Sequence, residues 1–397
     1  MYRNRPAGYF FLFILLALMM MVSADFARAV EQPDFDLNSS SAILLEYTSG
    51  DILYEKNPHE ELPPASMAKI MTMLLVMEAV EDGRADLDDK IVISEHAAEM
   101  GGSQIWLEPG EEMSLRELLK AIAIVSANDA CVAVAEYLYG TEDAFVDRMN
   151  ERARELGLEH TYFYNTNGLP SGESDVEGTY TCAHDLAVMA RELISYSRVL
   201  EWTSTWIDYL RDGESVLNNT NRLIRHYQGA DGLKTGYTDE AKFGLTGTAE
   251  RNGMRFISVV MGAESSMLRF EESVQLLSYG FNSFRPLDIA SKGEVVWQAD
   301  VWNARERSVE LRAAKSLKIP QKKGEKEEIV RRVYVDEDLS APLHKGEKAG
   351  KVEVLRGDKV LAEVDIVVSR DVEKVPLFTL VFRLIERLLS SLKNIFS

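Results

Sequence analysis

Strand patterns stand at both ends of residues 36–285, with helical patterns between them, and this order constrains the fold more than any other feature. Strands from both ends of a segment can share one sheet when the middle of the segment forms a layer of helices. We therefore expect an α+β fold, in which one antiparallel sheet carries a helical insertion. Strand patterns lie at 41–47, 51–56, 231–238, 242–250 and 253–262, and helical patterns at 66–82, 114–139, 141–156, 181–195 and 266–283.

Residues 286–370 have a different pattern, in which short β-branched runs alternate with glycine-containing turns. This pattern is typical of a small all-β domain. A chain of 397 residues is long enough for two or three domains. We expect one domain at residues 30–285 and a second at residues 286–370.

The first 29 residues have the features of a secretory signal peptide. Arg3 and Arg5 precede an apolar run from Tyr9 to Val22, and Ala27-Arg28-Ala29 follows as a small-x-small cleavage site. The apolar run is shorter than the roughly 20 residues that a membrane span needs. We predict that the protein is exported and that residues 1–29 are removed; an uncleaved anchor is the alternative.

Residues 371–397 end the chain, and in them an amphipathic helical pattern begins at Leu377, after a charged segment at 369–374. Apolar residues recur every three or four positions from Leu377 to Phe396, and Arg383 and Lys393 lie on the other side. The pattern is basic although the whole chain carries a formal charge of −20. Such a helix lies in the membrane interface, its basic face at anionic headgroups. We expect a spacer at 369–374 and an anchor at the outer face of the cytoplasmic membrane; a helix packed on the preceding domain is the alternative.

The composition excludes several classes of function. An acidic chain with a charge of −20 lacks the basic surface of a nucleic-acid-binding protein. Two cysteines are too few for a disulfide scaffold, and the six histidines show no zinc-ligand spacing. We therefore expect no metal and no cofactor. Cys131 is expected to be a small buried hydrophobic residue, and a bond to Cys182 stays open.

Ser66 and Lys69 form the first chemical motif. Three positions apart on a helix, the two side chains share one face, so the lysine nitrogen can reach the hydroxyl. A serine becomes a nucleophile when a neighbouring base takes its proton, and lysine is such a base when burial or positive charge lowers its pKa. Pro63-Pro64-Ala65 sets Ser66 at a helix N-terminus, where negative charge is stabilised. The same spacing at Ser390 and Lys393 lacks this context.

Two further motifs follow along the chain. Ser126-Ala127-Asn128 separates two helical patterns, and Lys234-Thr235-Gly236 opens a strand pattern. Alone, the first is a capped helix break and the second an edge-strand turn. In this order with Ser-x-x-Lys, on helix, loop and strand, they form the motif set of the penicilloyl-serine enzymes.

On these motifs the chain resembles the low-molecular-mass penicillin-binding proteins, serine D-alanyl-D-alanine carboxypeptidases of the sporulation and vegetative group. The resemblance covers almost the whole chain and implies a β-lactamase/transpeptidase-like fold. The segment Thr161–Leu169 is similar to the family's Asn-Pro-x-Gly-Leu phrase, with Thr166 in place of proline. Ala263 and Glu264 stand where some relatives carry a basic residue. Other matching phrases are Leu44–Glu46, Thr48–Gly50, Ser126–Cys131, Asp231–Thr238, Ala241–Leu245 and Val259–Gly262.

The resemblance implies catalytic roles for three residues. Ser66 attacks the carbonyl between the two D-alanines of a peptidoglycan stem peptide, and the terminal D-alanine leaves. Lys69 is the base, and Ser126 passes the proton to the leaving amine.

Five more residues are implied to bind the substrate. Asn128 holds the peptide amide and Lys69. Lys234 lowers the pKa of Lys69 and, with Thr235, attracts the terminal carboxylate. Gly236 lets the substrate lie along the strand edge. The backbone N–H groups of Tyr237 and Ser66 form the oxyanion hole.

Three other functions stay open: a β-lactamase-like hydrolase, a peptidoglycan endopeptidase and a catalytically idle wall-binding protein. Serine enzymes that deacylate quickly use a glutamate on a loop beyond Ser-x-Asn. No glutamate with a neighbouring asparagine stands between Thr161 and Pro170. We therefore expect β-lactams to be covalent inhibitors that leave slowly. A role in cell growth, cell shape or spore cortex stays open.

Overall fold

A computed structural model describes Pro33 and residues 35–171, 178–324 and 328–376, together with 378–381, 383 and 385. The predicted signal peptide at residues 1–29 lies outside the described residues. The tail after residue 385 also lies outside them.

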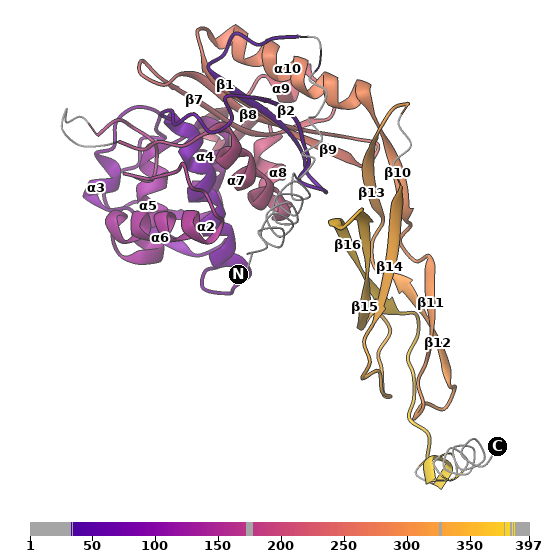
Figure 1. Ribbon diagram of the computed structural model, residues 1–397. Helices are drawn as coiled ribbons and strands as arrows, with labels where there is room; N and C mark the ends of the chain where they lie inside the picture. Colours follow the sequence, from indigo (N-terminus) through magenta and orange to yellow (C-terminus); the bar gives the residue numbers. More distant parts are fainter. Residues whose placement is uncertain are drawn as a thin grey trace, which may run out of the picture. The chain divides into compact units, whose positions relative to one another are not determined.

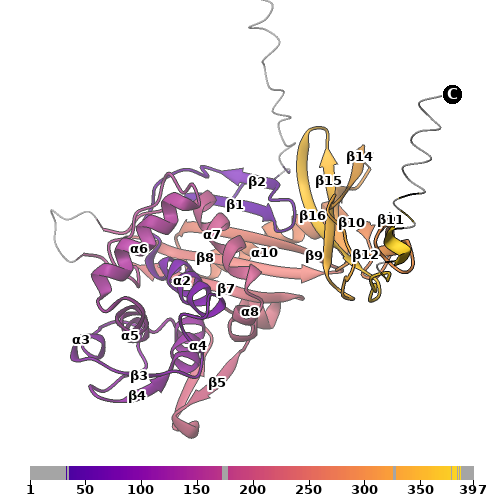
Figure 2. The same ribbon diagram turned by 90° about the horizontal axis from the view of Figure 1, so that it is seen from below.

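A five-stranded antiparallel sheet organises the first part of the chain. Its strands stand in the order β2-β1-β9-β8-β7, and Figure 2 shows them side by side. The first two strands precede the helices in sequence and the last three follow them, as the order of patterns predicts. The strands are β1 (Ser41–Glu46), β2 (Ile52–Lys56), β7 (Ala230–Thr238), β8 (Lys242–Arg251) and β9 (Met254–Ala263).

Strand β1 is buried on both faces because helices cover both sides of the sheet. Ile43 and Leu45 pack into the core shared with the helical insertion. Ala42 and Leu44 pack into a second core with α10 (Ser266–Ser283). Figure 1 shows α10 on one side of the sheet and α2 (Lys69–Glu81), α5 (Asn128–Tyr139) and α6 (Glu142–Glu155) on the other. The sheet is therefore the middle layer of three.

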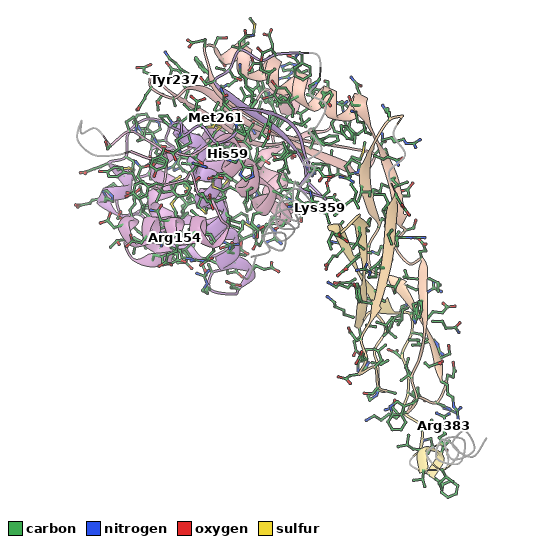
Figure 3. The ribbon with its side chains drawn as sticks, in the orientation of Figure 1. His59, Arg154, Tyr237, Met261, Lys359 and Arg383 are labelled. Atoms are coloured by element: carbon green, nitrogen blue, oxygen red, sulfur yellow. The ribbon has the colours of Figure 1, made fainter. Side chains whose placement is uncertain are left out.

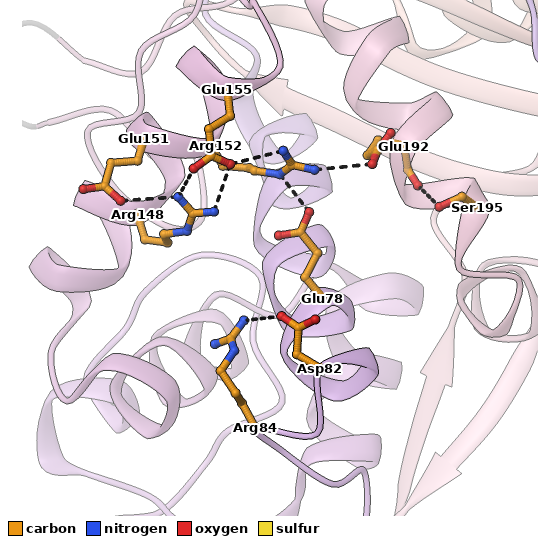
Figure 4. A network of polar contacts seen from close by, with 9 residues as sticks. All are labelled: Glu78, Asp82, Arg84, Arg148, Glu151, Arg152, Glu155, Glu192 and Ser195. Atoms are coloured by element: carbon orange, nitrogen blue, oxygen red, sulfur yellow. Dashed lines mark hydrogen bonds and ion pairs between the residues drawn. The ribbon is translucent and has the colours of Figure 1, made fainter. Parts of the chain in front are cut away.

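The helical insertion surrounds α2 (Lys69–Glu81), which is buried along most of its length. Arg152 of α6 joins this helix to two others. Its guanidinium pairs with Glu78 of α2 at 2.8 Å and with Glu192 of α7 at 3.3 Å (Figure 4). The other elements are η1 (Ala65–Ala68), α3 (Glu95–Ala98), α4 (Leu115–Val125), α5 (Asn128–Tyr139), α6 (Glu142–Glu155), α7 (Ala183–Ser195), α8 (Arg198–Thr203), α9 (Leu223–His226), η2 (Arg211–Gly213), and the hairpins β3 (Lys90–Val92) with β4 (Glu112–Ser114) and β5 (Ile207–Leu210) with β6 (Ser215–Asn218).

The chain after α10 is built of strands, with an apolar core of its own. One sheet pairs two strands and the other has the order β11-β12-β16-β15-β14. The predicted fold class, an α+β unit followed by an all-β unit, is therefore confirmed. The strands are β10 (Phe284–Ala290), β11 (Val295–Asp300), β12 (Ser308–Ala313), β13 (Leu317–Lys322), β14 (Ile329–Val335), β15 (Lys348–Arg356) and β16 (Lys359–Val368).

Residues 372–374 differ from the predicted spacer. Val372 pairs with Leu343 and Lys374 pairs with Ala304, so these residues lie against the all-β unit. The reason is that Val372 fills the apolar core, where it is 3% exposed. A helix follows, with residues 378–381, 383 and 385 described. Among the described residues, no helix combines the length and apolar character of a membrane span.

Candidate active site

Ser66 lies in η1, the short turn that leads into α2. Its side chain is half-buried, whereas the residues on both sides of it are buried. Ala65, just before it, has a left-handed φ of 47°, which is uncommon for a residue with a β-carbon. Such strain persists where the surrounding structure fixes the backbone, and it is concentrated at active sites.

The fully buried amine of Lys69 is the centre of the polar contacts. Its Nζ lies 2.8 Å from Ser66 Oγ and 3.3 Å from Ser126 Oγ. It donates hydrogen bonds to Asn128 Oδ1 at 2.7 Å and to the backbone oxygen of Asn167 at 3.0 Å. The structure thus brings the first two predicted motifs together around one nitrogen.

Burial lowers the pKa of Lys69 to about 8, while the nearby Cys131 and Asp129 act in the opposite direction. With this pKa, roughly a tenth of the amines are neutral at pH 7. A neutral amine has two N–H groups and one lone pair. The oxygens of Asn128 and Asn167 can accept from the two N–H groups, which leaves the lone pair for the hydroxyl of Ser66. The site therefore suits a neutral lysine that accepts a proton.

Ser126 and Asn128 stand at the break between α4 and α5. Ser126 ends α4 in a left-handed conformation with φ 67°, and its hydroxyl thereby reaches Lys69. Asn128 begins α5, and its Nδ2 donates to the oxygen of Gly101 at 2.7 Å. Its backbone N–H donates to the oxygen of Ser103 at 2.7 Å. The backbone oxygens of Gly101 and Ser103 therefore hold Asn128, and with it the second motif, in place.

Lys234 and Thr235 lie on β7, and both are buried. Lys234 Nζ donates to the oxygen of Thr235 at 3.0 Å, and Thr235 Oγ1 lies 2.7 Å from Thr220 Oγ1. Burial first, and the charge of Lys69 second, hold the pKa of Lys234 well below its ordinary value. The sequence predicts that Lys234 lowers the pKa of Lys69; in the structure, burial is the main cause of that lower pKa.

Two glycines lie directly against the backbone that precedes Ser66. A β-carbon on Gly236 would lie 2.6 Å from the oxygen of Pro64, and one on Gly168 would lie 2.0 Å from the oxygen of Ala65. The motif predicts that Gly236 leaves room for substrate along the strand. In the structure its missing side chain also leaves room for the protein's own backbone, because β7 and η1 approach each other there.

The last predicted residue, Tyr237, is half-exposed near the end of β7, where Figure 3 labels it. Its ring stacks on Phe243 with 4.3 Å between the ring centres, and its hydroxyl donates to Asp239 Oδ1 at 2.7 Å. Strand β7 is an edge of the sheet. One row of its backbone groups is therefore not used by β8, and an extended peptide can pair there.

Arg269 of α10 is a site residue that the sequence analysis does not single out. Its guanidinium donates to the oxygens of Gly236 at 2.9 Å and Gly244 at 3.2 Å. Burial lowers its pKa to about 10. Three basic groups, those of Lys69, Lys234 and Arg269, are thus buried behind or beside β7 and make this part of the site basic. An arginine within an ordinary helical pattern gives no local signal of this role.

The remaining sequence predictions for the site concern cysteines and metals. Cys131 and Cys182 are both buried and free. Burial raises the pKa of each thiol to about 12, so neither is a reactive thiolate. Within the described ranges, no group of three or more His, Cys, Asp or Glu side chains is arranged to hold a metal ion.

A serine beside a buried lysine, with Ser-x-Asn and Lys-Thr-Gly on an α+β fold, defines an active-site serine enzyme of the penicilloyl-serine class. The chain belongs to the D-alanyl-D-alanine carboxypeptidase family, whose model matches residues 27–265. The C-terminal domain of penicillin-binding protein 5 matches residues 284–374. The chain is therefore a serine D-alanyl-D-alanine carboxypeptidase, and the predicted family is confirmed.

Three known proteins illustrate the likeness. The chain is 41% identical to the D-alanyl-D-alanine carboxypeptidase DacF of Bacillus subtilis, over 93% of this chain and 96% of the relative. PBP3 of Streptococcus pneumoniae, a peptidoglycan synthesis regulatory factor, has a TM-score of 0.73 at 28% identity, covering 85% of this chain and 100% of that chain. Penicillin-binding protein D2 of Listeria monocytogenes, solved in an ampicillin-bound form, has a TM-score of 0.57 at 34% identity, covering 63% and 100%.

Proposed function

We propose that Ser66 is the nucleophile of this carboxypeptidase and that it shortens the stem peptides of peptidoglycan by one D-alanine. Ser66 Oγ attacks the carbonyl carbon of the penultimate D-alanine while its proton passes to the neutral amine of Lys69. The C–N bond then breaks, and the amine of the terminal D-alanine takes a proton through Ser126. Water then attacks the ester on Ser66 and gives a proton to Lys69, which is neutral again, and this proton returns to Ser66 Oγ as the shortened peptide leaves. The oxyanion is held by the backbone N–H groups of Ser66 and Tyr237.

The single observation that carries this proposal is the coordination of Lys69 Nζ. Its two carbonyl contacts match the two N–H groups of a neutral amine, and its third close contact, at 2.8 Å, is Ser66 Oγ. A base must lie within hydrogen-bond reach of the proton that it takes. Lys69 meets this condition, and its lowered pKa of about 8 provides the neutral form.

Substrate recognition follows from the buried basic groups near β7 and from the position of this strand at the edge of the sheet. Lys234 and Thr235 bind the terminal carboxylate, supported by the field of Arg269. The peptide pairs with the free edge of β7 beyond Gly236, and the second Nδ2 hydrogen of Asn128 donates to its amide oxygen. A carboxylate at the end of the substrate therefore meets a basic site in an otherwise acidic protein, which favours a free C-terminus over an internal peptide bond.

The test uses the chain from residue 30 onward with diacetyl-Lys-D-Ala-D-Ala, measuring free D-alanine, beside labelling with fluorescent penicillin. We expect D-alanine release and a covalent label, and we expect both to be lost in Ser66→Ala. Ser390→Ala is the matched control, because it removes the other serine of a Ser-x-x-Lys spacing. Label without D-alanine release would favour an endopeptidase or another acyl acceptor. Neither signal from folded protein would favour the idle wall-binding protein.

We further propose that β-lactams inhibit the protein through a slowly hydrolysed ester on Ser66. The ampicillin-bound relative from Listeria monocytogenes supports this proposal. The region between Thr161 and Pro170 lacks the glutamate that a fast β-lactamase would use. A label that disappears within minutes, with many molecules of penicillin hydrolysed per enzyme, would instead favour the β-lactamase-like function.

For its location, we propose export with loss of residues 1–29 and anchoring of the tail, residues 371–397, at the outer face of the cytoplasmic membrane. Phe378, Val381 and Ile385 share one helix face and are 85%, 49% and 50% exposed, which supports a lipid-facing surface. Arg383, which Figure 3 labels, donates to the backbone oxygens of Trp302 and Ala304, where the helix meets the all-β unit.

Flotation with liposomes that contain anionic lipid tests the anchor. We expect the chain from residue 30 to float, and a chain that ends at Val375 to stay in solution. Phe378→Ser with Ile385→Ser should weaken flotation, whereas a serine substitution of the exposed Val295 on β11 should not. Equal flotation of the truncated chain would contradict the anchor.

The proposed domains are 30–285 for the peptidase and 286–370 for the all-β domain, supported by the end of α10 at Ser283.

A further inference from the structure

We propose that Glu142 is a positioning residue for this reaction, because it holds Thr166 so that the carbonyl of the next residue, Asn167, is presented to Lys69. The inference rests on the proposed role of Lys69 as the base. A continuous chain of contacts leads from Glu142, in the first turn of α6, to the amine of Lys69.

The first contact joins Glu142 to Thr166. Glu142 Oε1 accepts hydrogen bonds from the backbone N–H of Thr166 at 3.1 Å and from Thr166 Oγ1 at 2.7 Å. Thr166 is fully buried, and the Glu142 side chain is 16% exposed. A carboxylate is a stronger acceptor than a neutral group. Without it, two buried donors would lose their partner.

The second contact transfers this constraint to the active site. The oxygen of Thr166 accepts from Thr72 Oγ1 at 2.6 Å, so both sides of this residue are held. The next residue is Asn167, whose oxygen lies 3.0 Å from Lys69 Nζ. A rotation of the backbone at Thr166 would therefore move the carbonyl that orients the Lys69 amine toward Ser66.

Thr166 is the residue at which this chain departs from the family phrase, which has proline there. A proline has no N–H and no hydroxyl, so it would offer Glu142 neither donor. Threonine offers both. The other oxygen of Glu142 lies 3.4 Å from His96 Nε2 of α3, which holds the carboxylate from the far side.

The test compares Glu142→Ala, Glu142→Gln, Thr166→Val and the double variant Glu142→Ala/Thr166→Val. Asp143→Ala is the matched control, because Asp143 is exposed in the same helix turn and carries the same charge. For each variant we would measure the rate of acylation by fluorescent penicillin, its pH profile and the melting temperature. D-alanine release from diacetyl-Lys-D-Ala-D-Ala provides the second activity.

We expect Glu142→Ala to slow acylation about tenfold or more, because a small misplacement of a catalytic group is costly. Glu142→Gln should restore most of the rate, since its amide oxygen can accept both hydrogens, and the double variant should be no slower than Glu142→Ala. The acid limb of the pH profile should move to lower pH, because the charged form of Lys69 loses an acceptor. Asp129, Cys131 and Lys234 also face Lys69, and they are unchanged in every variant.

A loss in Asp143→Ala as large as in Glu142→Ala would overturn the inference. An unchanged acid limb, together with a loss of acylation rate that matches the loss of folded protein, would also overturn the inference. If Glu142→Ala does not fold, Thr166→Val gives the same pH test, since it removes one hydrogen bond and keeps the side-chain volume. A wild-type protein without label or D-alanine release would refute the proposed function instead, independently of Glu142.

Discussion

Gly168 lies so close to Ala65 that a β-carbon on it would stand 2.0 Å from the Ala65 carbonyl oxygen. Gly236 has the same relationship to Pro64, at 2.6 Å. Gly168 also has a φ of +78°, which a residue with a side chain rarely adopts. Two glycines from distant parts of the chain therefore set the backbone just before Ser66.

The two glycines can be tested by alanine. We expect Gly168→Ala and Gly236→Ala to lower the free energy of unfolding by about 1–3 kcal/mol, since the backbone must shift. Acylation should fall about tenfold or more, because the shift moves Ser66. Thermal denaturation and the labelling rate would measure the two effects. Gly178→Ala is the control, because nothing lies near its β-carbon position; an equal loss there would contradict the prediction.

The pH dependence of acylation should report the pKa of Lys69. In the proposed mechanism the neutral amine is the active form, so the rate should rise with pH through an acid limb near 8. Lys69→Arg should lose nearly all acylation, since its guanidinium stays charged. The labelling rate between pH 6 and 10 provides the measurement. A limb near the ordinary lysine value of about 10.4 would show that burial does not set this pKa.

Asp129 should support Asn128 through the neighbouring segment. Its carboxylate accepts from the N–H groups of Ile105 at 3.0 Å and Leu107 at 3.2 Å, and the same segment carries the oxygens that hold Asn128. Asp129→Asn replaces one acceptor oxygen by a donor. We expect a loss of about 1–3 kcal/mol of stability and a higher KM. Glu99→Gln, at an exposed position, serves as the control, and equal effects of the two changes would refute this role.

Arg152 should matter more for stability than its neighbour Arg148, although both pair with glutamates (Figure 4). Glu78, the partner of Arg152, is 14% exposed, whereas Glu155, the partner of Arg148, is 47% exposed. Arg152→Met leaves a largely buried carboxylate unpaired and should cost about 3 kcal/mol. Arg148→Met should cost less than about 1 kcal/mol. Urea denaturation would compare them, and the reverse order would contradict this reading.

The sequence by itself determined the order of the elements and the class of the enzyme. The predicted helix at 266–283 has the bounds of α10, and the strands predicted at 231–238 and 242–250 differ from β7 and β8 by one residue at one end. Periodicity is carried by neighbouring residues, so each segment shows its own structure. The three motifs are likewise short and local. Their order along the chain was enough to indicate the chemistry.

Only the tertiary structure decided how the site is assembled. It brought the Asn167 carbonyl to Lys69, packed Gly168 and Gly236 against η1, and set Arg269 behind β7. It also showed that burial is the main cause of the low pKa of Lys69, and that residues 372–374 lie against the all-β unit. These features depend on contacts between residues far apart in sequence. Burial and distance exist only after the chain has folded, so no local pattern encodes them.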